Sequence, residues 1–173
     1  MDFIPFVTLR LRTKLSFEDV IEKLDSVIEP KKFTIFGNLG YSKSFRGELL
    51  EDSFTMIRNN VLYQNSFMPV IKGKILRKSG YTVLEIFMRM NLFVIIFMGF
   101  WLITPLLLTG KYLFDFLIHN HGSLLTSIMP MALFVFGYVI MMLSFTFESR
   151  KAQKIIQQLL NTEQFDEINR IFE

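Results

Sequence analysis

Two stretches decide the fold of this sequence: LFVIIFMGFWLITPLLL over residues 92–108, and LLTSIMPMALFVFGYVIMMLSFTF over residues 124–147. Neither stretch contains a charged residue. A helix needs about 20 apolar residues to cross the roughly 30 Å hydrocarbon layer of a bilayer, with a lower limit near 17. The sequence therefore predicts a two-helix transmembrane hairpin within residues 91–147, with spans over about 92–109 and 124–147.

The hairpin divides the 173 residues into a domain at 1–90 and a tail at 148–173, both predicted to be cytosolic. Residues 1–90 hold fourteen Lys and Arg against ten Asp and Glu. This excess is too small for the basic stripe that is typical of nucleic-acid-binding proteins, so we expect no nucleic-acid partner. It suits a domain close to anionic lipids. The expected partners are the lipid bilayer and either a second copy of the chain or another membrane protein.

Residues 1–90 predict an α+β domain. Residues 7–15 alternate between apolar and polar, which is typical of a half-buried strand. Ser16 and Asp19 then form a capping-box pattern before a helix over 17–29, which Pro30 ends. Further strands are predicted at 31–36, 44–50, 54–58, 61–64, 70–77 and 81–90. We expect a small, mainly antiparallel sheet with one packed helix.

The domain is joined to the first span without a linker. Asn91 is suited to cap a helix, and Leu92 is already apolar. Gly110 is a natural end for this helix, although the apolar residues 112–118 either prolong it or lie along the interface. Behind the second span, residues 152–160 carry an apolar stripe at helical spacing. This C-terminal amphipathic helix has three open roles: packing on its own domain, pairing with a partner helix, or lying on the membrane.

Basic residues lie on one side of the predicted hairpin. Lys72, Lys74, Arg77, Lys78 and Arg89 precede the first span, and Arg150, Lys151 and Lys154 follow the second, whereas the connecting loop contains Lys111 alone. The positive-inside rule therefore predicts that both termini are cytoplasmic. The acidic start of the chain, with Asp2 near Met1, does not resemble a signal peptide.

Few residues supply reactive chemistry. There is no cysteine, and the two histidines, His119 and His121, lie on the predicted outer turn near Asp115. A metal site would need further ligands, so a polar turn is the simpler interpretation. The methionines near the spans suit adaptable packing better than copper(I) binding. We predict no catalytic residue, cofactor or metal ligand, and we do not expect an enzyme.

Five residues are candidates for contact with a ligand or lipid: Arg10, Arg12, Lys14, Asn65 and Arg89. The first three form a basic stripe on one face of the first predicted strand, which could meet anionic groups. Asn65 begins the segment Asn65-Ser-Phe-Met-Pro69, where Pro69 marks a strand entry or edge. A solvated strand face and a structural turn are the plainer alternatives for these features.

Several motifs in the domain resemble a known family. They are Phe45-Arg-Gly47, Phe54, the run from Tyr63 to Ile75 (YQNSFMPVIKGKI), and Phe87-Met-Arg-Met90. They are similar to motifs of a family of small, uncharacterised bacterial membrane proteins with two spans. The chain departs from the family at Gln64, where the family has arginine, and at Met90-Asn-Leu92, where the family has Leu-His-Pro. The resemblance implies a bacterial inner-membrane protein, and it implies no activity.

The leading functional hypothesis is a non-catalytic, multi-pass protein of the inner (cytoplasmic) membrane. Its cytosolic α+β domain would bind a partner or small ligand and would be rigidly joined to the membrane helices. The alternative is a defence-type effector that disrupts membranes when a ligand triggers oligomerisation through the two transmembrane helices.

Overall fold

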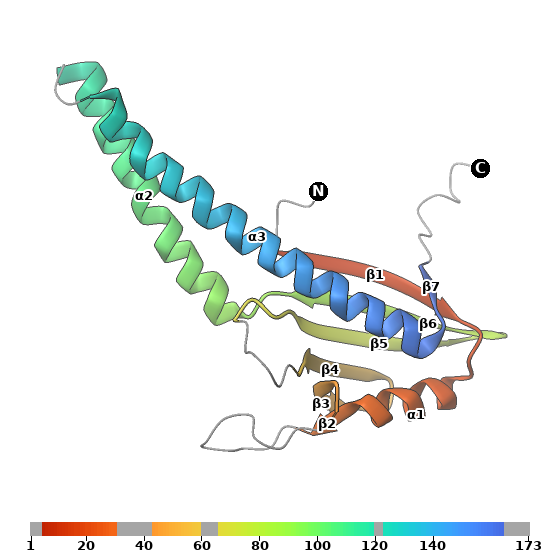
Figure 1. The fold of residues 1–173 in the computed structure, drawn as a ribbon. Helices are drawn as coiled ribbons and strands as arrows, with labels where there is room; N and C mark the ends of the chain where they lie inside the picture. The colour runs from red at the N-terminus through yellow and green to blue at the C-terminus, as the bar shows by residue number, and fades with distance from the viewer. Residues whose placement is uncertain (1–4, 31–42, 60–65, 120–122, 165–173) are drawn as a thin grey trace, which may run out of the picture.

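One mixed sheet and two long helices make up most of the described chain. The computed structural model describes residues 5–30, 43–59, 66–119 and 123–164 (Figure 1). The helices are α1 (Phe17–Val27), α2 (Leu92–His119) and α3 (Leu124–Leu160). The strands are β1 (Phe6–Thr13), β2 (Ile28–Pro30), β3 (Phe45–Leu49), β4 (Ser53–Arg58), β5 (Val70–Lys78), β6 (Tyr81–Arg89) and β7 (Glu163–Gln164). The α+β class predicted from the sequence is confirmed.

The sheet has the strand order β2-β3-β4-β5-β6-β1-β7. All neighbouring pairs are antiparallel except β2 and β3, which are parallel. β6 lies between β5 and β1. The β5–β6 turn contains Gly80 at φ +81°, a left-handed conformation that glycine adopts without strain. The predicted strands at 31–36 and 61–64 lie outside the described residues.

One face of the sheet, here called the covered face, packs against helices. Its side chains alternate along each strand with those of the opposite, open face, because successive side chains of a strand point to opposite sides. Leu11, Leu84 and Ile75 lie side by side on three neighbouring strands and are fully or almost fully buried. The same core contains Val20 and Leu24 of α1 together with the C-terminal part of α3.

The helix α3 is continuous from the apolar hairpin into the core of the domain (Figure 1). Beyond the apolar stretch it buries a residue at every fourth position: Glu148, Ala152, Ile156 and Leu160. Such spacing places all four on one side of the helix. Its C-terminus is held by hydrogen bonds from Thr13 Oγ1 to Leu160 O (2.8 Å) and from Lys23 Nζ to Leu159 O (3.0 Å). Of the three roles open from the sequence for residues 152–160, the structure shows packing on their own domain.

The first long helix also begins where the sequence indicated. Asn91 Oδ1 accepts a hydrogen bond from Phe93 N at 2.9 Å, so Asn91 caps α2. The helix then runs past the predicted end of the span, through Gly110, to His119. The apolar residues 112–118 thus prolong the helix. Among the described residues, two helices, α2 and α3, are by length and composition apolar enough to cross a membrane.

Replacing Leu24 by alanine should lower the free energy of unfolding by about 2–5 kcal/mol, since this fully buried side chain joins α1 to the sheet. Urea unfolding of the purified protein in detergent, followed by circular dichroism, would measure the loss. Leu50→Ala is the control, because Leu50 is 64% exposed and its truncation leaves no cavity. Equal midpoints for the parent and Leu24→Ala would contradict the packing of α1 on the sheet.

Candidate functional site

The open face of the sheet collects most of the candidate contact residues. Cross-strand neighbours share a face, so the register places Arg10, Glu85 and Lys74 in one row across β1, β6 and β5. Another row contains Phe6, Arg89 and Val70. All of these side chains point away from α1 and α3, because their neighbours along the strands, Leu9, Leu11 and Ile86 among them, are buried on the covered face.

Basic residues outnumber acidic residues on the open face. The basic residues are Arg10, Arg12, Arg46, Lys72, Lys74, Lys78 and Arg89. The acidic residues are Glu29, Glu48 and Glu85, and Glu163 of β7 faces Arg12 in the register. Glu85 is paired with Arg10 at 2.7 Å, and the Arg12 guanidinium lies 3.9 Å from the ring centroid of Tyr81. Cations gathered on one face raise the local concentration of anions. The open face is therefore suited to an anionic ligand or an acidic surface.

The structure places three of the five predicted contact residues on the open face. Arg10 and Arg12 are on β1, and Arg89 ends the adjacent strand β6, about 13 Å along the strand from the position facing Arg10. Lys14 lies just beyond β1, beside a shallow hollow that Lys78 and Tyr81 also line. Asn65 lies outside the described residues. A ligand role for these residues stays a prediction.

Sequence reasoning missed Lys72, Lys74 and Arg46 as members of the same surface. Their own strands gave the signal, since Lys72 and Lys74 alternate with Ile71, Gly73 and Ile75. What was lacking was the register that sets these lysines beside Glu85 and Phe87 of β6. Register depends on pairing between strands, and one strand's sequence does not contain it.

A buried ion pair lies on the covered face, where α3 enters the domain. Arg58 at the end of β4 donates a hydrogen bond to Glu148 Oε2 at 2.5 Å. The Glu148 side chain is 0% exposed and the Arg58 side chain 14% exposed. Within the described chain, no hydrogen-bond partner meets Arg58 Nε, Glu148 Oε1 or the neighbouring Ser149 Oγ. The pair thus fastens α3 to the sheet in a site shielded from water.

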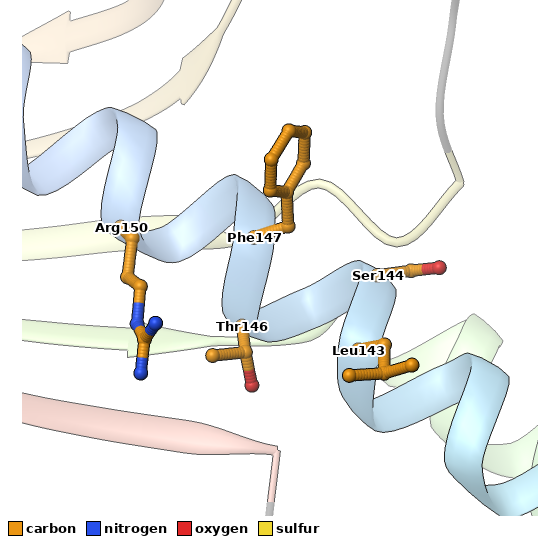
Figure 2. Close-up of a pocket in the computed structure, with 5 residues that line it drawn as sticks. All are labelled: Leu143, Ser144, Thr146, Phe147 and Arg150. Carbon is orange, nitrogen blue, oxygen red and sulfur yellow. The ribbon is translucent and has the colours of Figure 1, made fainter.

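A hollow of about 390 Å³ lies beside α3 at the same level (Figure 2). It is lined by Leu143, Ser144, Thr146, Phe147 and Arg150. Figure 2 shows Phe147 and Arg150 projecting from opposite sides of the helix, so these side chains do not converge on one enclosed point. Lys151 Nζ lies 4.0 Å from the ring centroid of Phe147. The helix therefore presents aromatic and basic groups together where it leaves its apolar stretch.

A larger groove, of about 910 Å³, lies between α2 and α3 within the hairpin. Pro105 and Pro130 line it together with aromatic and aliphatic side chains that include Phe100, Trp101 and Phe136. The hydroxyl of Thr104, which also lines the groove, donates to Phe100 O of its own helix at 3.2 Å. The groove is therefore apolar and suits only an apolar occupant.

The described part of the chain contains no cluster of three His, Cys, Asp or Glu side chains that could hold a metal ion. His119 Nδ1 lies 3.7 Å from Asp115 Oδ1 at the tip of the hairpin, far from the sheet (Figure 1). His121 lies outside the described residues. The pair lies at the C-terminal end of α2, and the interpretation of the turn as merely polar stays a prediction.

Several described residues of the motifs quoted above pack within the sheet. Phe45 is fully buried, and a Cβ at Gly47 would lie 2.7 Å from Met56 Cα of the neighbouring strand. Gly73 pairs with Phe54, whose Cε2 would lie 2.7 Å from a Cβ on that glycine. Pro69 immediately precedes β5, as expected for a strand entry. These motif positions therefore build the sheet, and they point to no reaction.

Comparison with known proteins identifies no relative: no protein-family model matches the chain, and no curated protein or solved structure is significantly similar to it.

Proposed function

We propose that the chain is a non-catalytic, two-span membrane protein whose cytosolic sheet domain binds an anionic ligand or an acidic partner on its open face. The domain and the hairpin act as one body. The observation that supports this proposal best is the continuity of α3, which runs from the apolar hairpin into the core of the domain. A ligand that tilts or straightens the sheet would therefore move the membrane helices as well.

Exposure of apolar side chains supports membrane insertion of the hairpin. In the most apolar 18-residue segment of each helix, only 22% of α2 and 17% of α3 is buried. Large side chains such as Phe93, Phe100 and Leu107 are each more than two-thirds exposed. A contiguous apolar surface of this kind is unfavourable in water and favourable in lipid. The charge asymmetry around the spans supports an orientation with both termini in the cytoplasm.

Cysteine labelling would test this topology, because the parent chain contains no cysteine. Ser123→Cys at the hairpin tip should react with a membrane-impermeant maleimide in intact cells with a permeabilised outer membrane. Ser79→Cys, in the exposed β5–β6 turn, should react only after the inner membrane is broken. Reaction of Ser79→Cys in intact cells, with Ser123→Cys silent, would contradict the proposed orientation.

Photo-crosslinking would test the open face as the binding surface. A crosslinking amino acid at Thr8, on the open face, should capture a bound species in native membranes, and one at Glu22, on the outside of α1, should not. Combining the Thr8 probe with Arg12→Glu and Lys74→Glu should abolish the capture, because both changes replace a cation by an anion. Unchanged capture in that variant, or equal capture from Glu22, would contradict an electrostatic site on this face.

The effector alternative is favoured by one observation, the apolar groove beside Pro105 and Pro130, which offers an apolar surface for contact between copies. Pore formation also needs polar groups that face a channel, and the hydroxyls of Thr104 and Thr109 are bonded to carbonyls of their own helix. Dye-loaded liposomes containing the pure protein separate the two hypotheses. We expect no leakage, and rapid release of the dye would favour the effector.

A further inference from the structure

We propose that anionic phospholipid headgroups bind at a basic and aromatic site where the hairpin leaves the domain. The site has two parts. The strand part consists of Phe6, Lys72, Phe87 and Arg89 at one end of the open face, and the helix part consists of Phe147, Arg150 and Lys151 on α3. This inference rests on the proposed membrane insertion, and it adds the class of lipid and the residues that meet it.

Backbone connections hold the strand part beside the start of α2. Phe6 pairs with Arg89, Met90 N donates to Pro5 O at 3.2 Å, and α2 begins at Leu92. Arg89 is therefore three residues from the first residue of the span. A helix that enters the hydrocarbon at Leu92 places Arg89 at the depth of the lipid headgroups.

Aromatic and basic side chains alternate in this corner. The rings of Phe6 and Phe87 are 6.1 Å apart, and the two residues are 43% and 38% exposed. Lys72 lies opposite Phe87 in the next strand. Among the described residues neither Lys72 nor Arg89 lies within 4.0 Å of a carboxylate. Exposed aromatic rings flanked by unpaired cations suit the boundary between acyl chains and phosphates.

The helix part has the same chemistry at the same level. Phe145 belongs to the buried cluster that contains Met90, so the turn after Phe145 lies beside the start of α2. Phe147 is 59% exposed, Lys151 covers its ring at 4.0 Å, and Arg150 projects from the other side of the helix (Figure 2). Two separate segments thus present aromatic and basic groups at the level where the hairpin meets the domain.

The full-length protein in mild detergent, titrated with phosphatidylglycerol or phosphatidylcholine and followed by native mass spectrometry, would test the site. The parent should retain phosphatidylglycerol in preference to phosphatidylcholine. Lys72→Glu/Arg89→Glu should weaken retention of phosphatidylglycerol by at least about fivefold per cation, as should Arg150→Glu/Lys151→Glu. The matched control is Arg77→Glu/Lys154→Glu, which makes the same charge change at two exposed residues outside both the proposed site and the open face and should retain the parental affinity.

Equal weakening in the control would show attraction by overall charge only and would overturn the site, as would equal retention of the two lipids by the parent. The circular dichroism spectra of all variants should match that of the parent, as expected if each variant is folded. Cysteine labelling of the parent keeps this test apart from the proposed function. If the hairpin is inserted but the protein shows no lipid preference, only the headgroup site is contradicted. If the hairpin is not inserted, both the headgroup site and the proposed function are contradicted.

Discussion

Glu148→Ala is expected to lower the free energy of unfolding by about 3–5 kcal/mol, because it leaves Arg58 as an uncompensated charge on the covered face. The same loss is expected from Arg58→Ala, which leaves the fully buried carboxylate of Glu148 without its cationic partner. Urea unfolding in detergent, followed by circular dichroism, would measure both. Because Glu148 is also the first docked residue of α3 beyond the apolar stretch, the variant should loosen this helix from β4.

Two controls separate the buried charge from a general effect of truncation. Arg77→Ala removes an exposed ion pair with Glu18 and should cost at most about 1 kcal/mol. The double replacement Arg58→Met/Glu148→Leu removes both charges and restores apolar packing, so it should recover most of the stability. A stable Glu148→Ala variant, with a midpoint like that of Arg77→Ala, would show that the pair is not shielded from water.

Gly47→Ala is expected to destabilise the domain by about 3 kcal/mol, the upper end of the usual cost of overpacking. A Cβ at this position would overlap Thr55 O and would lie 2.7 Å from Met56 Cα, both of which belong to the backbone of β4. A backbone cannot rotate away as a side chain can, so β3 and β4 must separate or the strand must shift. The same unfolding experiment would measure the effect. Gly99→Ala is the control, since a Cβ on Gly99 meets no atom within 4 Å. The urea midpoint of this variant should equal that of the parent.

The elements with long, regular patterns were predictable from the sequence. The alternation in residues 7–15, the capping box at Ser16, and the tight turn between residues 77 and 81 each rest on local chemistry, and β1, α1 and the β5–β6 hairpin follow it. The short strands β2 and β7 were not predicted. They have three and two residues, too few to show a period, and their place is set by pairing with β3 and β1.

The continuity of α3 was not predicted from the sequence. The charged run Glu148-Ser-Arg-Lys151 follows the apolar stretch and indicates the end of a span, although nothing in it breaks a helix. Glu148 is hidden by Arg58, which is ninety positions earlier in the chain. Contacts at that separation depend on the fold as a whole. The basic stripe on β1, in contrast, could be predicted from the sequence, because all of its residues lie within one strand.

The central claim is that α3 makes the hairpin and the domain one rigid body. Spin labels at Ile118→Cys, near the tip of the hairpin, and Ser79→Cys, in the β5–β6 turn, would report it as a distance distribution in lipid nanodiscs. We predict one narrow distance distribution for the parent and a broad one when Gly-Gly-Ser is inserted after Phe147. The same insertion after Glu51, in the β3–β4 turn, should leave the distribution narrow. A broad distribution in the parent, or one that the insertion in α3 leaves narrow, would contradict the claim.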